Sequence, residues 1–515
     1  MLHRQATPST HHAAASSTAS LLPLVVDLDG TLTHSDSLVE SVVQVVKHSP
    51  LNLLRLPFWM LGGRASFKRA VATRTDPAQL HLPYRQALLE YLRQQRALGR
   101  KLVLATAAHE SIAQRVASEL DVFDCVLATC GGANLKGQAK LAAIREHVGD
   151  DFVYVGDSAA DIPIWQSSRG AVFASVSSRT RAAVGPAVPI ERDFPDDRKR
   201  LLLWLRALRV HQWTKNLLLF VPLLTAFSFS DTQRLLSAVL AFFAFSLVAS
   251  ATYMVNDILD LENDRVHPRK RRRPFASGQL SLLHGLAAAA FTLALGLVLA
   301  AVVSVGFLLM LLLYLLLTSA YSWVIKKYVL MDVLMLSLLY TLRILAGSVS
   351  VGIEASSWLL VFSVFIFLSL ALVKRCAELT SLQQSGETAA RGRDYRVSDL
   401  TVLWPMGIGA ALSSVIVFGL FISSPDTQAR YASPELLWLV ELGLIYWLGR
   451  LWVKTSRNEM HDDPMVYAIR DGASRVTVAL MLVVVLCAHT IALGDRVAEP
   501  AQPVGSVVPI ERAVV

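Results

Sequence analysis

The sequence predicts two domains of different fold class: an N-terminal α/β domain with a parallel sheet, and a C-terminal all-α domain of nine membrane-spanning helices. The 515 residues are 53% hydrophobic and 17% charged, which is too apolar for a soluble protein. Up to about residue 200, short apolar runs alternate with polar turns and helical patterns. From about residue 216 the chain becomes a series of long apolar runs, so one soluble and one membrane domain are expected.

The chain ends, the cysteines and the net charge limit the interpretation further. Residues 1–20 have no apolar core, so we expect a disordered tail and no signal peptide. The four cysteines form no C-x-x-C pair, which argues against a disulfide framework or a zinc site. The net charge of +9 needs no nucleic acid partner, because cytosolic loops of membrane proteins carry excess Lys and Arg. The predicted segments are a tail (1–20), the α/β domain (21–188), an amphipathic linker helix (189–215), the membrane domain (216–495) and a second tail (496–515).

Three stretches of the soluble domain have the pattern of a strand, a polar turn and then a helix. They are "LLPLVVDLDGTLTHSDS" (21–37), "KLVLATAAHES" (101–111) and "DFVYVGDSAADIPIW" (151–165). Such alternation is typical of a parallel sheet with helices packed on it. In these sheets ligands bind at the carboxyl ends of the strands. Because all three polar clusters follow a strand, we expect them to form one site.

The stretch "DLDGT" places two carboxylates at a strand end. Asp27 is suited to attack a phosphorus atom, and Asp29 to protonate the leaving oxygen and later activate water. A carboxylate that attacks a phosphate dianion needs charge neutralised, which Mg²⁺ supplies. Asp27, the Asp29 carbonyl and a third acid are its expected ligands. The stretch "GDSAAD" offers Asp157 and Asp161 for this role.

Two further residues complete a recognisable series of motifs. Thr106 ends the middle strand with a hydroxyl for a phosphoryl oxygen, and Lys136 in "NLKGQAK" is placed to hold another. Lys140 is the alternative for the Lys role. An Asp-x-Asp strand end, a Ser/Thr strand end, a Lys and a paired-acid strand end, in this order, resemble the motifs of the haloacid dehalogenase (HAD) superfamily.

The resemblance implies a phosphatase with a small helical cap over residues 38–100, as in phosphoserine-phosphatase-like members. Two other interpretations remain: "DLDGT" is a polar turn without catalytic function, or the domain is a scaffold that docks partners. On the HAD interpretation, Asp27 is the nucleophile, Asp29 the acid/base, Thr106 and Lys136 the phosphate binders, Asp157 a magnesium ligand, and Asp161 a support of the metal site.

The membrane domain follows a segment, "IERDFPDDRKRLLLWLRALRVHQWTKN", whose cations alternate with Leu and Trp. This suits an amphipathic helix on the membrane surface and equally an ordinary linker helix. Nine apolar runs then approach the length of about 20 residues that crosses a bilayer. Lys and Arg gather in the loops after every second run, which predicts an inner-membrane protein with a cytosolic soluble domain and an outside C-terminus. The expected spans are about 216–230, 235–255, 283–301, 303–320, 330–350, 357–373, 402–422, 435–453 and 476–494.

The second span is followed by "NDILDLENDRVHPRKRRRP" (256–274), which carries acids at the membrane edge. Asn256, Asp257, Asp260 and Asp264 recur at spacings of three and four, so a helix presents them on one face. Stacked carboxylates repel one another unless a cation lies among them. Mg²⁺ bound to a diphosphate fits, because Mg²⁺ uses a few carboxylates together with substrate oxygens. The basic run that follows is expected mainly to fix the topology.

These residues resemble the aspartate-rich motif N-D-x-x-D-x-x-x-D of the UbiA prenyltransferase superfamily, whose members have nine transmembrane helices. "RVHQWTKN" (209–216), "YSWVIKKYVLMD" (321–332) and "LRILAG" (342–347) also fit. Members that prenylate aromatic acceptors usually carry a second aspartate-rich motif after the sixth span. Here that loop reads "VKRCAELTSLQQSGETAARGRDYRVSDL", which looks more like the branch that includes decaprenyl-phosphate phosphoribosyltransferase.

The resemblance therefore implies a bifunctional enzyme. Its membrane domain would transfer 5-phosphoribosyl from phosphoribosyl diphosphate to a polyprenyl phosphate, with Asp257, Asp260 and Asp264 holding Mg²⁺. Its HAD domain would hydrolyse a phosphomonoester, hypothesised to be the 5-phosphate of that product. The alternative is an aromatic prenyltransferase that uses a prenyl diphosphate, with a phosphatase of unrelated substrate. The sequence leaves open whether the chain forms a homo-oligomer.

Further basic and acidic residues are weaker candidates. Lys215, Lys326 and Arg343 are possible phosphate clamps because two phosphorylated substrates need extra cations. Asp463 and Asp471, in "MHDDPMVYAIRDG", either orient a substrate or, more in keeping with their type and position, cap helices.

Overall fold

The computed structural model describes residues 22–492 except 131–133, 197–199, 387, 390–392 and 461–463. The chain divides into two compact units. The first comprises residues up to 216 together with 242–302, and the second comprises 217–241 and the residues from 303 onward. The expected tails lie outside the described residues.

A six-stranded parallel sheet forms the centre of the soluble domain, in the order β3-β2-β1-β4-β5-β6. Strand β1 lies in the middle, where Val25 pairs with Val103 on one side and Tyr154 on the other. Alternate residues enter opposite cores, so Leu24 and Val26 face one core and Val25 the other. The strands are β1 (Leu24–Val26), β2 (Leu102–His109), β3 (Cys125–Thr129), β4 (Val153–Gly156), β5 (Gly170–Ala174) and β6 (Ile190–Phe194).

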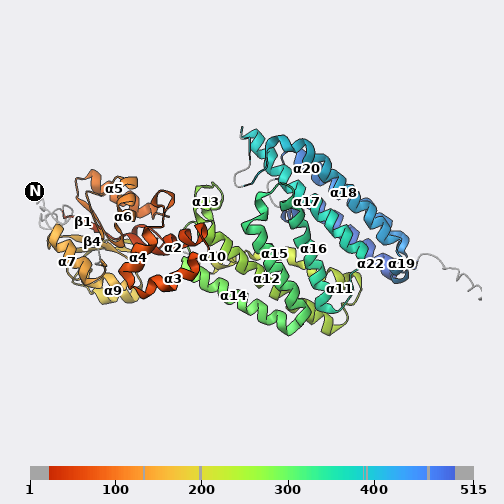
Figure 1. Cartoon of the computed structure of the whole chain (residues 1–515), viewed down its shortest axis with the longest axis horizontal. Helices are drawn as coiled ribbons and strands as arrows, with labels where there is room; N and C mark the ends of the chain where they lie inside the picture. The colour runs from red at the N-terminus through yellow and green to blue at the C-terminus, as the bar shows by residue number, and fades with distance from the viewer. Residues whose placement is uncertain are drawn as a thin grey trace, which may run out of the picture. The chain divides into compact units, whose positions relative to one another are not determined.

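Helices cover both faces of the sheet, which is why its strands are apolar along their whole length. Figure 1 shows α5 and α6 on one side of β1 and β4, and α7 and α9 on the other. These elements supply buried side chains to the two separate cores. The covering helices are α5 (Gln86–Ala97), α6 (Glu110–Leu120), α7 (Gln138–His147), η3 (Ala159–Asp161), α8 (Ile162–Trp165) and α9 (Ser178–Val184).

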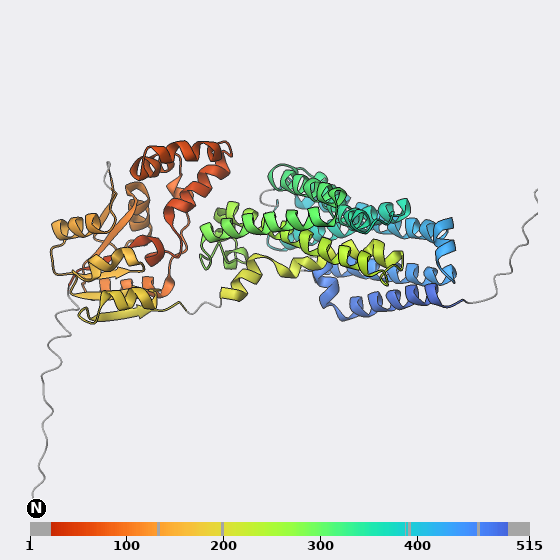
Figure 2. The same ribbon diagram turned by 90° about the horizontal axis from the view of Figure 1, so that it is seen from below.

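Between β1 and α5 the chain forms a helical cap, which Figure 2 shows in red, projecting beyond the sheet. It is shorter than the expected stretch of 38–100. Leu88 and Leu92 of α5 are fully buried in a core of the sheet, so α5 belongs to the sheet layers. The elements from β1 to α5 are η1 (Leu28–Leu32), α2 (Ser37–His48), α3 (Asn52–Leu61), α4 (Arg64–Ala72) and η2 (Pro77–Gln79).

The segment 189–215, expected to be one linker helix, has a different structure. Its start is β6, which pairs with β5, so the sheet extends past the expected boundary at 188. The helical part is the eight-residue α10 (Arg200–Ala207), followed by the 3₁₀ segment η4 (Val210–Phe220). Residues 190–194 form a strand because they pair with β5 and bury Phe194 in a core of the sheet.

Eight described helices are long and apolar enough to span a membrane, so the expectation of nine is wrong by this measure. The first expected span, 216–230, contains instead the end of η4 and the short helix α11 (Val221–Thr225). Pro222 cannot donate a backbone hydrogen bond, which disfavours one continuous helix here. The eight are Thr232–Leu259 (α12), Leu282–Val303 (α14), Val305–Trp323 (α15), Met331–Val351 (α16), Ser357–Gln384 (α17), Val397–Ile422 (η7 and α18), Pro434–Ser456 (η8 and α20) and Gly472–Thr490 (α22).

In the second unit α17, α18 and α20 pack against one another. Gly407 of α18 lies against the indole of Trp452, where an added Cβ would come within 2.2 Å of the ring. The indole nitrogen donates to the hydroxyl of Ser369 (3.1 Å), which donates in turn to the carbonyl of Gly407 (2.9 Å). A small residue and a satisfied polar chain thus join three helices. Shorter helices of this unit are η6 (Ile325–Lys327), α19 (Pro425–Arg430) and α21 (Pro464–Arg470).

In the first unit, cap helix α2 packs on α13 (Leu261–Val266), the short helix after α12. The guanidinium of Arg265 binds both carboxylate oxygens of Glu40, at 2.5 and 2.7 Å, and both side chains are buried. Lys47 of α2 also lies 2.6 Å from Glu262. Arg265 therefore belongs to an internal ion pair, while Arg269, Lys270, Arg271 and Arg272 of the same basic run are exposed.

We predict that Arg265→Met destabilises the first unit by about 3–5 kcal/mol, because it leaves the Glu40 carboxylate buried without its cation. The measurement is thermal unfolding of the full chain in detergent. Arg271→Met, on an exposed position, is the matched control and should melt like the wild type. Adding Glu40→Gln to Arg265→Met should recover part of the loss. Equal melting of the Arg265 and Arg271 variants would contradict the prediction.

Candidate functional site

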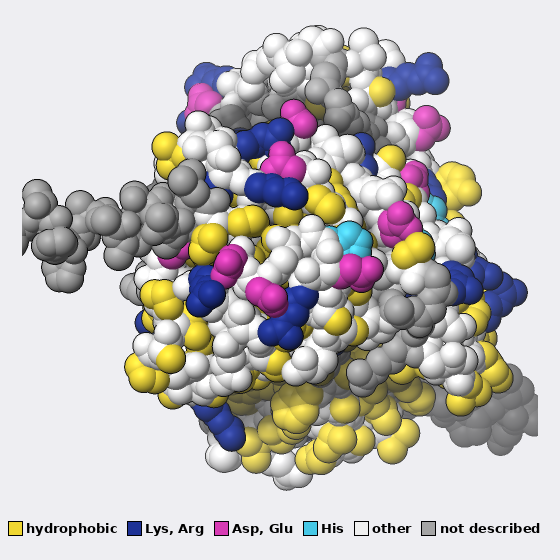
Figure 3. All heavy atoms as spheres, turned by 90° about the vertical axis from the view of Figure 1, so that its left-hand side faces the viewer, with side chains coloured by type: hydrophobic (Ala, Val, Ile, Leu, Met, Phe, Trp, Pro, Cys, Tyr) yellow, Lys and Arg dark blue, Asp and Glu magenta, His cyan; other side chains and the backbone are white. Residues whose placement is uncertain are grey.

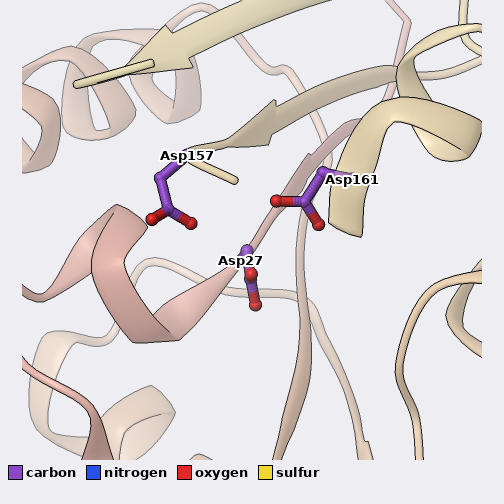
Figure 4. A group of neighbouring side chains, drawn as sticks. All are labelled: Asp27, Asp157 and Asp161. Carbon is purple, nitrogen blue, oxygen red and sulfur yellow. The ribbon is translucent and has the colours of Figure 1, made fainter. Parts of the chain in front are cut away.

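Three carboxylates converge at the carboxyl edge of the sheet. Asp27 follows β1, Asp157 follows β4, and Asp161 ends η3. One oxygen from each lies within 4.8 Å of the others, and Figure 4 shows the three side chains as neighbours. Neighbouring strands β1 and β4 bring together residues that are more than a hundred positions apart. Oxygen ligands in this number suit a hard cation such as Mg²⁺.

The loop after β1 is fixed closely around these acids. Gly30 has φ of +77°, and an added Cβ there would come within 2.3 Å of an Asp157 oxygen, so a side chain is excluded. The hydroxyl of Thr31 donates to Asp157 (3.2 Å). Buried Arg85 donates to the carbonyls of Gly30 and Thr31, both at 3.1 Å. The hydrogen bonds from Arg85 therefore stabilise the conformation of this loop. Arg85 belongs to none of the motifs found in the sequence.

A buried lysine, Lys140 on the first turn of α7, contacts the acids directly. Its Nζ lies 2.9 Å from Asp27 and 3.8 Å from Asp161, and it donates to the hydroxyl of Tyr154 (3.1 Å). Burial alone lowers the pKa of Lys140, but the carboxylates outweigh it and raise the pKa overall. Lys136, the residue first expected in this role, is exposed and lines the same cavity.

Two other side chains line the edge of the sheet near the acids. Thr106 is fully buried in β2, and its hydroxyl accepts the backbone N–H of Ala108 (3.0 Å). Lys68 of cap helix α4 donates to the carbonyl of Ala107 (2.6 Å) and to Asn134 (2.7 Å), which attaches the cap to the end of β2. Burial lowers the pKa of Lys68.

Burial raises the pKa of three acids at this edge of the sheet. It raises the pKa of Asp29 to about 7, with the charge of Asp36 adding to the effect, although the backbone N–H of Ser37 stabilises the carboxylate. It also raises the pKa of Asp157 to about 7, with the charge of Asp27 contributing. The pKa of Asp27 is raised by burial too, against the opposing charge of Lys140. A cation among these carboxylates would relieve their repulsion, so the donor set fits Mg²⁺.

The cluster opens into a cavity of about 510 Å³ between the sheet edge and the cap. This is large enough for a phosphorylated small molecule or the polar end of a larger one. The strand ends supply most of its charged lining, and the cap adds apolar side chains together with the charged Lys68. Among the lining residues are Asp27, Asp29, Lys68, Lys136, Lys140 and Asp157.

The aspartate-rich segment of the first unit forms a second acidic cluster. Asn256 and Asp257 lie in the last turn of α12, Asp260 precedes α13, and Asp264 lies within α13. The backbone N–H groups of Asp260 and Asp264 bond to the carbonyls four residues before, at 2.9 Å each. Helical backbone hydrogen bonding therefore continues across the break between the two helices.

Two arginines contact acids of the aspartate-rich segment. Nη1 of Arg273 lies 2.9 Å from Asp257 and 2.6 Å from Asp264, so one guanidinium joins both carboxylates. Arg209 also pairs with Asp257. Burial raises the pKa of Asp264, although Arg273 acts in the opposite direction. Among the described residues, Asp257, Asp260 and Asp264 do not bring three oxygens as close together as the three acids at the sheet edge do.

The second unit contains a separate buried network. Asp332, at the start of α16, pairs with Arg375 of α17 (2.6 Å) and accepts from the hydroxyl of Tyr395 (2.5 Å). Arg375 also pairs with Glu378, which lies 3.2 Å from Arg393. Two stretches noted in the sequence, 321–332 and the loop after α17, are thereby joined. Asp332, Tyr395 and Arg393 were not identified as site residues from the sequence.

The remaining predicted residues lie in different parts of the two units. Lys215 in η4 and Lys326 in η6 are half-buried. Arg343 is buried within α16, donates to the hydroxyl of Tyr314 (3.2 Å), and stacks over that ring. Asp471 caps α22 by accepting from Ser474 N–H (2.8 Å), as the capping interpretation expected, and Asp463 lies outside the described residues.

Sequence comparisons match both halves of the chain. The model of the UbiA prenyltransferase family matches residues 217–468, and that of haloacid dehalogenase-like hydrolases matches residues 24–166. A solved structure of a UbiA homolog from Archaeoglobus fulgidus bound to GPP and Mg²⁺ aligns with a TM-score of 0.42 and 17% identity, over 55% of this chain and 99% of that one.

This chain aligns with most of the length of three curated relatives. Uncharacterized protein y4nM of Sinorhizobium fredii is 39% identical over 88% of this chain and 88% of its own. Nodulation protein NoeC of Azorhizobium caulinodans is 35% identical over 57% of this chain and 96% of its own. Decaprenyl-phosphate phosphoribosyltransferase of Corynebacterium glutamicum is 34% identical over 44% of this chain and 69% of its own.

The raised pKa values of Asp29 and Asp157 predict that, in chelator, the chain loses thermal stability as the pH rises. Both carboxyls hold protons in the folded state up to about pH 7, but in the unfolded state only up to a pKa of 3.8. Stability is therefore lost between these pH values and levels off above them. Asp157→Asn should flatten this dependence in thermal unfolding between pH 5 and 8. An exposed control, Asp150→Asn, should not change it.

Proposed function

The chain belongs to the UbiA prenyltransferase family and carries an N-terminal haloacid dehalogenase-like hydrolase domain. We therefore propose the following two-step reaction. The membrane domain transfers 5-phosphoribosyl from phosphoribosyl diphosphate to a polyprenyl phosphate. The hydrolase domain then removes the 5-phosphate of the lipid-linked product. The protein is an integral membrane enzyme with transferase and phosphatase-type activity, and the proposal concerns its substrates.

The observation that carries the choice of donor is the similarity to decaprenyl-phosphate phosphoribosyltransferase, at 34% identity over 69% of that protein. The charges support it. The loop after α17 contributes Arg375 and Arg393 to a network with Asp332, where aromatic prenyltransferases usually have a second aspartate-rich motif. Two phosphorylated substrates need more fixed positive charge than one prenyl diphosphate and a neutral ring.

In the proposed transfer, a phosphate oxygen of the lipid attacks the anomeric carbon of ribose as diphosphate leaves. Asp257, Asp260 and Asp264 would hold Mg²⁺, which neutralises the leaving diphosphate. Arg209 and Arg273 already contact two of these carboxylates and keep them oriented. The rate would come from positioning and from charge neutralisation, without a covalent enzyme intermediate.

In the proposed hydrolysis, Asp27 attacks phosphorus and the ester oxygen leaves with a proton from Asp29. Asp29 then removes a proton from the water that cleaves the phosphoaspartate. A pKa of about 7 suits a group that acts first as acid and then as base near neutral pH. Lys140 lies 2.9 Å from the nucleophile and favours its ionised form. Asp27, Asp157 and Asp161 would hold the Mg²⁺ that neutralises the phosphate.

Both reactions belong on one side of the membrane, and we place the soluble domain in the cytosol. The exposed cations Arg269 to Arg272 follow the aspartate-rich segment directly, as is usual for cytosolic loops. Hydrolysis of the first product would pull a reversible transfer forward. Joining both activities in one chain raises the effective concentration of that product at the second site.

The decisive assay supplies labelled phosphoribosyl diphosphate and polyprenyl phosphate to the full chain in membranes. We expect a labelled lipid in wild type and release of inorganic phosphate from it. Asp27→Asn should stop phosphate release by at least about 1,000-fold while the phosphorylated lipid accumulates. Label in lipid only when a prenyl diphosphate and an aromatic acid are supplied would favour the aromatic prenyltransferase alternative.

Asp260→Asn should have the converse effect. It should reduce formation of the labelled lipid by at least about 100-fold, because a ligand of the proposed Mg²⁺ is lost. Hydrolysis of p-nitrophenyl phosphate by the same variant should stay within twofold of wild type. If neither Asp27→Asn nor Asp260→Asn affects its own reaction, a non-catalytic scaffold is the better explanation.

The two lysines provide a matched pair for the phosphatase site. Lys140→Met should reduce phosphomonoester hydrolysis by about 100-fold, since it removes the buried cation beside Asp27. Lys136→Met, on the exposed rim, should cost less than about tenfold. The measurement is kcat/KM for p-nitrophenyl phosphate. A larger loss in the Lys136 variant would return the phosphate-binding role to that residue.

A further inference from the structure

Cap helix α3 has an unusually apolar surface for a helix outside the membrane-spanning segments. Asn52 is the residue of this helix that is buried. Soluble proteins rarely leave large apolar side chains exposed in such a contiguous group, and where they do it marks a binding surface. We name the group the α3 apolar face: Leu51, Leu53, Leu54, Phe58, Met60 and Leu61, which are 58–84% exposed.

The charged side chains of this part of the chain have one sign. Residues 49–75, which contain α3 and α4, carry five cationic side chains and no carboxylate. The face of the protein shown in Figure 3 differs, because cationic and acidic side chains are interspersed there. Exposed Leu and Phe together with cations and without acids are typical of helices that lie in the interface of an anionic membrane.

The α3 apolar face borders the phosphatase cavity. Met60 at the end of α3 and Phe67 of α4 line this cavity together with Asp27. A smaller cavity of about 230 Å³ joins Asp29 and Asp157 to Leu282 and Leu283, the first residues of the spanning helix α14. Both cavities belong to the first unit. The catalytic acids therefore lie beside an apolar hairpin and beside the start of a membrane span.

We infer that the α3 apolar face lies in the cytosolic headgroup region of the membrane that holds the chain, and that the phosphatase site accepts phosphomonoesters of membrane-anchored lipids. The statement about substrates rests on the proposed function. A lipid of this kind keeps its apolar chain in the bilayer while its phosphate reaches Asp27. Because the chain is already anchored in the membrane, the helix meets the bilayer at high effective concentration.

The first experiment tests the membrane contact and needs no enzymatic activity. The four native cysteines are replaced by alanine, Leu54→Cys is labelled with the polarity-sensitive dye NBD, and the full chain is reconstituted into vesicles of phosphatidylcholine and phosphatidylglycerol. We expect blue-shifted emission that doxyl-labelled lipids quench. Gln94→Cys on an exposed part of α5 is the matched control and should stay unquenched. Equal emission and quenching at both positions would overturn the inference.

Two further measurements distinguish contact with the bilayer from contact with a second chain: one varies the lipid composition, and the other varies the number of chains per vesicle. Quenching at Leu54 should fall at least twofold in vesicles of phosphatidylcholine alone, since the cations lose their anionic partners. If the probe is instead protected in proportion to the number of chains per vesicle, and shows energy transfer to a labelled second chain, the face is a dimer contact and the inference fails.

The second experiment tests the substrate class with Leu54→Glu/Phe58→Glu, which lies outside the catalytic residues. We expect kcat/KM for a long-chain alkyl phosphate in vesicles to fall at least tenfold, while kcat/KM for soluble p-nitrophenyl phosphate stays within twofold. Equal losses for both substrates, or none, would overturn the substrate inference. If the wild type hydrolyses neither substrate in an Asp27-dependent manner, the proposed phosphatase function fails, and the NBD result still decides the membrane contact.

Discussion

A carboxylate that is removed from water must be neutralised, and this constraint shapes both units of the chain. The cost of burying an unpaired ion is several kcal/mol, more than most single contacts contribute. Four buried acids in the described part of the chain therefore lie beside a basic side chain, whereas Asp29 and Asp157 respond to burial with a raised pKa. Asp27 has Lys140, Asp257 and Asp264 share Arg273, and Asp332 has Arg375. Such fixed charge is also what phosphoryl and glycosyl transfer to phosphates requires, because it needs no rearrangement during the reaction.

The same constraint explains why the two catalytic domains suit one another. Both would act on phosphates near a membrane surface, where charge has to be balanced within the protein. The Glu40 and Arg265 pair joins the cap to the helix that carries Asp264, so a residue of the basic run stabilises the first unit as well. Transfer and hydrolysis in one chain would keep a lipid-linked intermediate near the second site, and an apolar cap helix would suit a substrate that stays in the bilayer.

Motif spacing located most of the candidate site but not all its partners. Asp27, Asp157 and Asp161 converge as strand ends of a parallel sheet must. Lys136 was preferred to Lys140 from the sequence, but the first turn of α7 directs Lys140 inward. Arg273 was assigned to a topology signal, although it lies between two carboxylates. The spacing of residues along the chain shows which basic side chains are present near the acids in the sequence. It does not show which of these side chains the folded turn or loop directs toward the carboxylates.

The sequence by itself determined the α/β class of the soluble domain, the acids at its strand ends, the aspartate-rich segment and the membrane character of the second half. These follow from periodicity and local chemistry, which are properties of adjacent residues. Tertiary structure decided that 190–194 is a strand, that 216–230 contains a 3₁₀ segment and a short helix, and which cations pair with which acids. The strand and the ion pairs depend on partners that are not adjacent in the sequence, because an edge strand or a buried charge is stable only when its neighbour satisfies it.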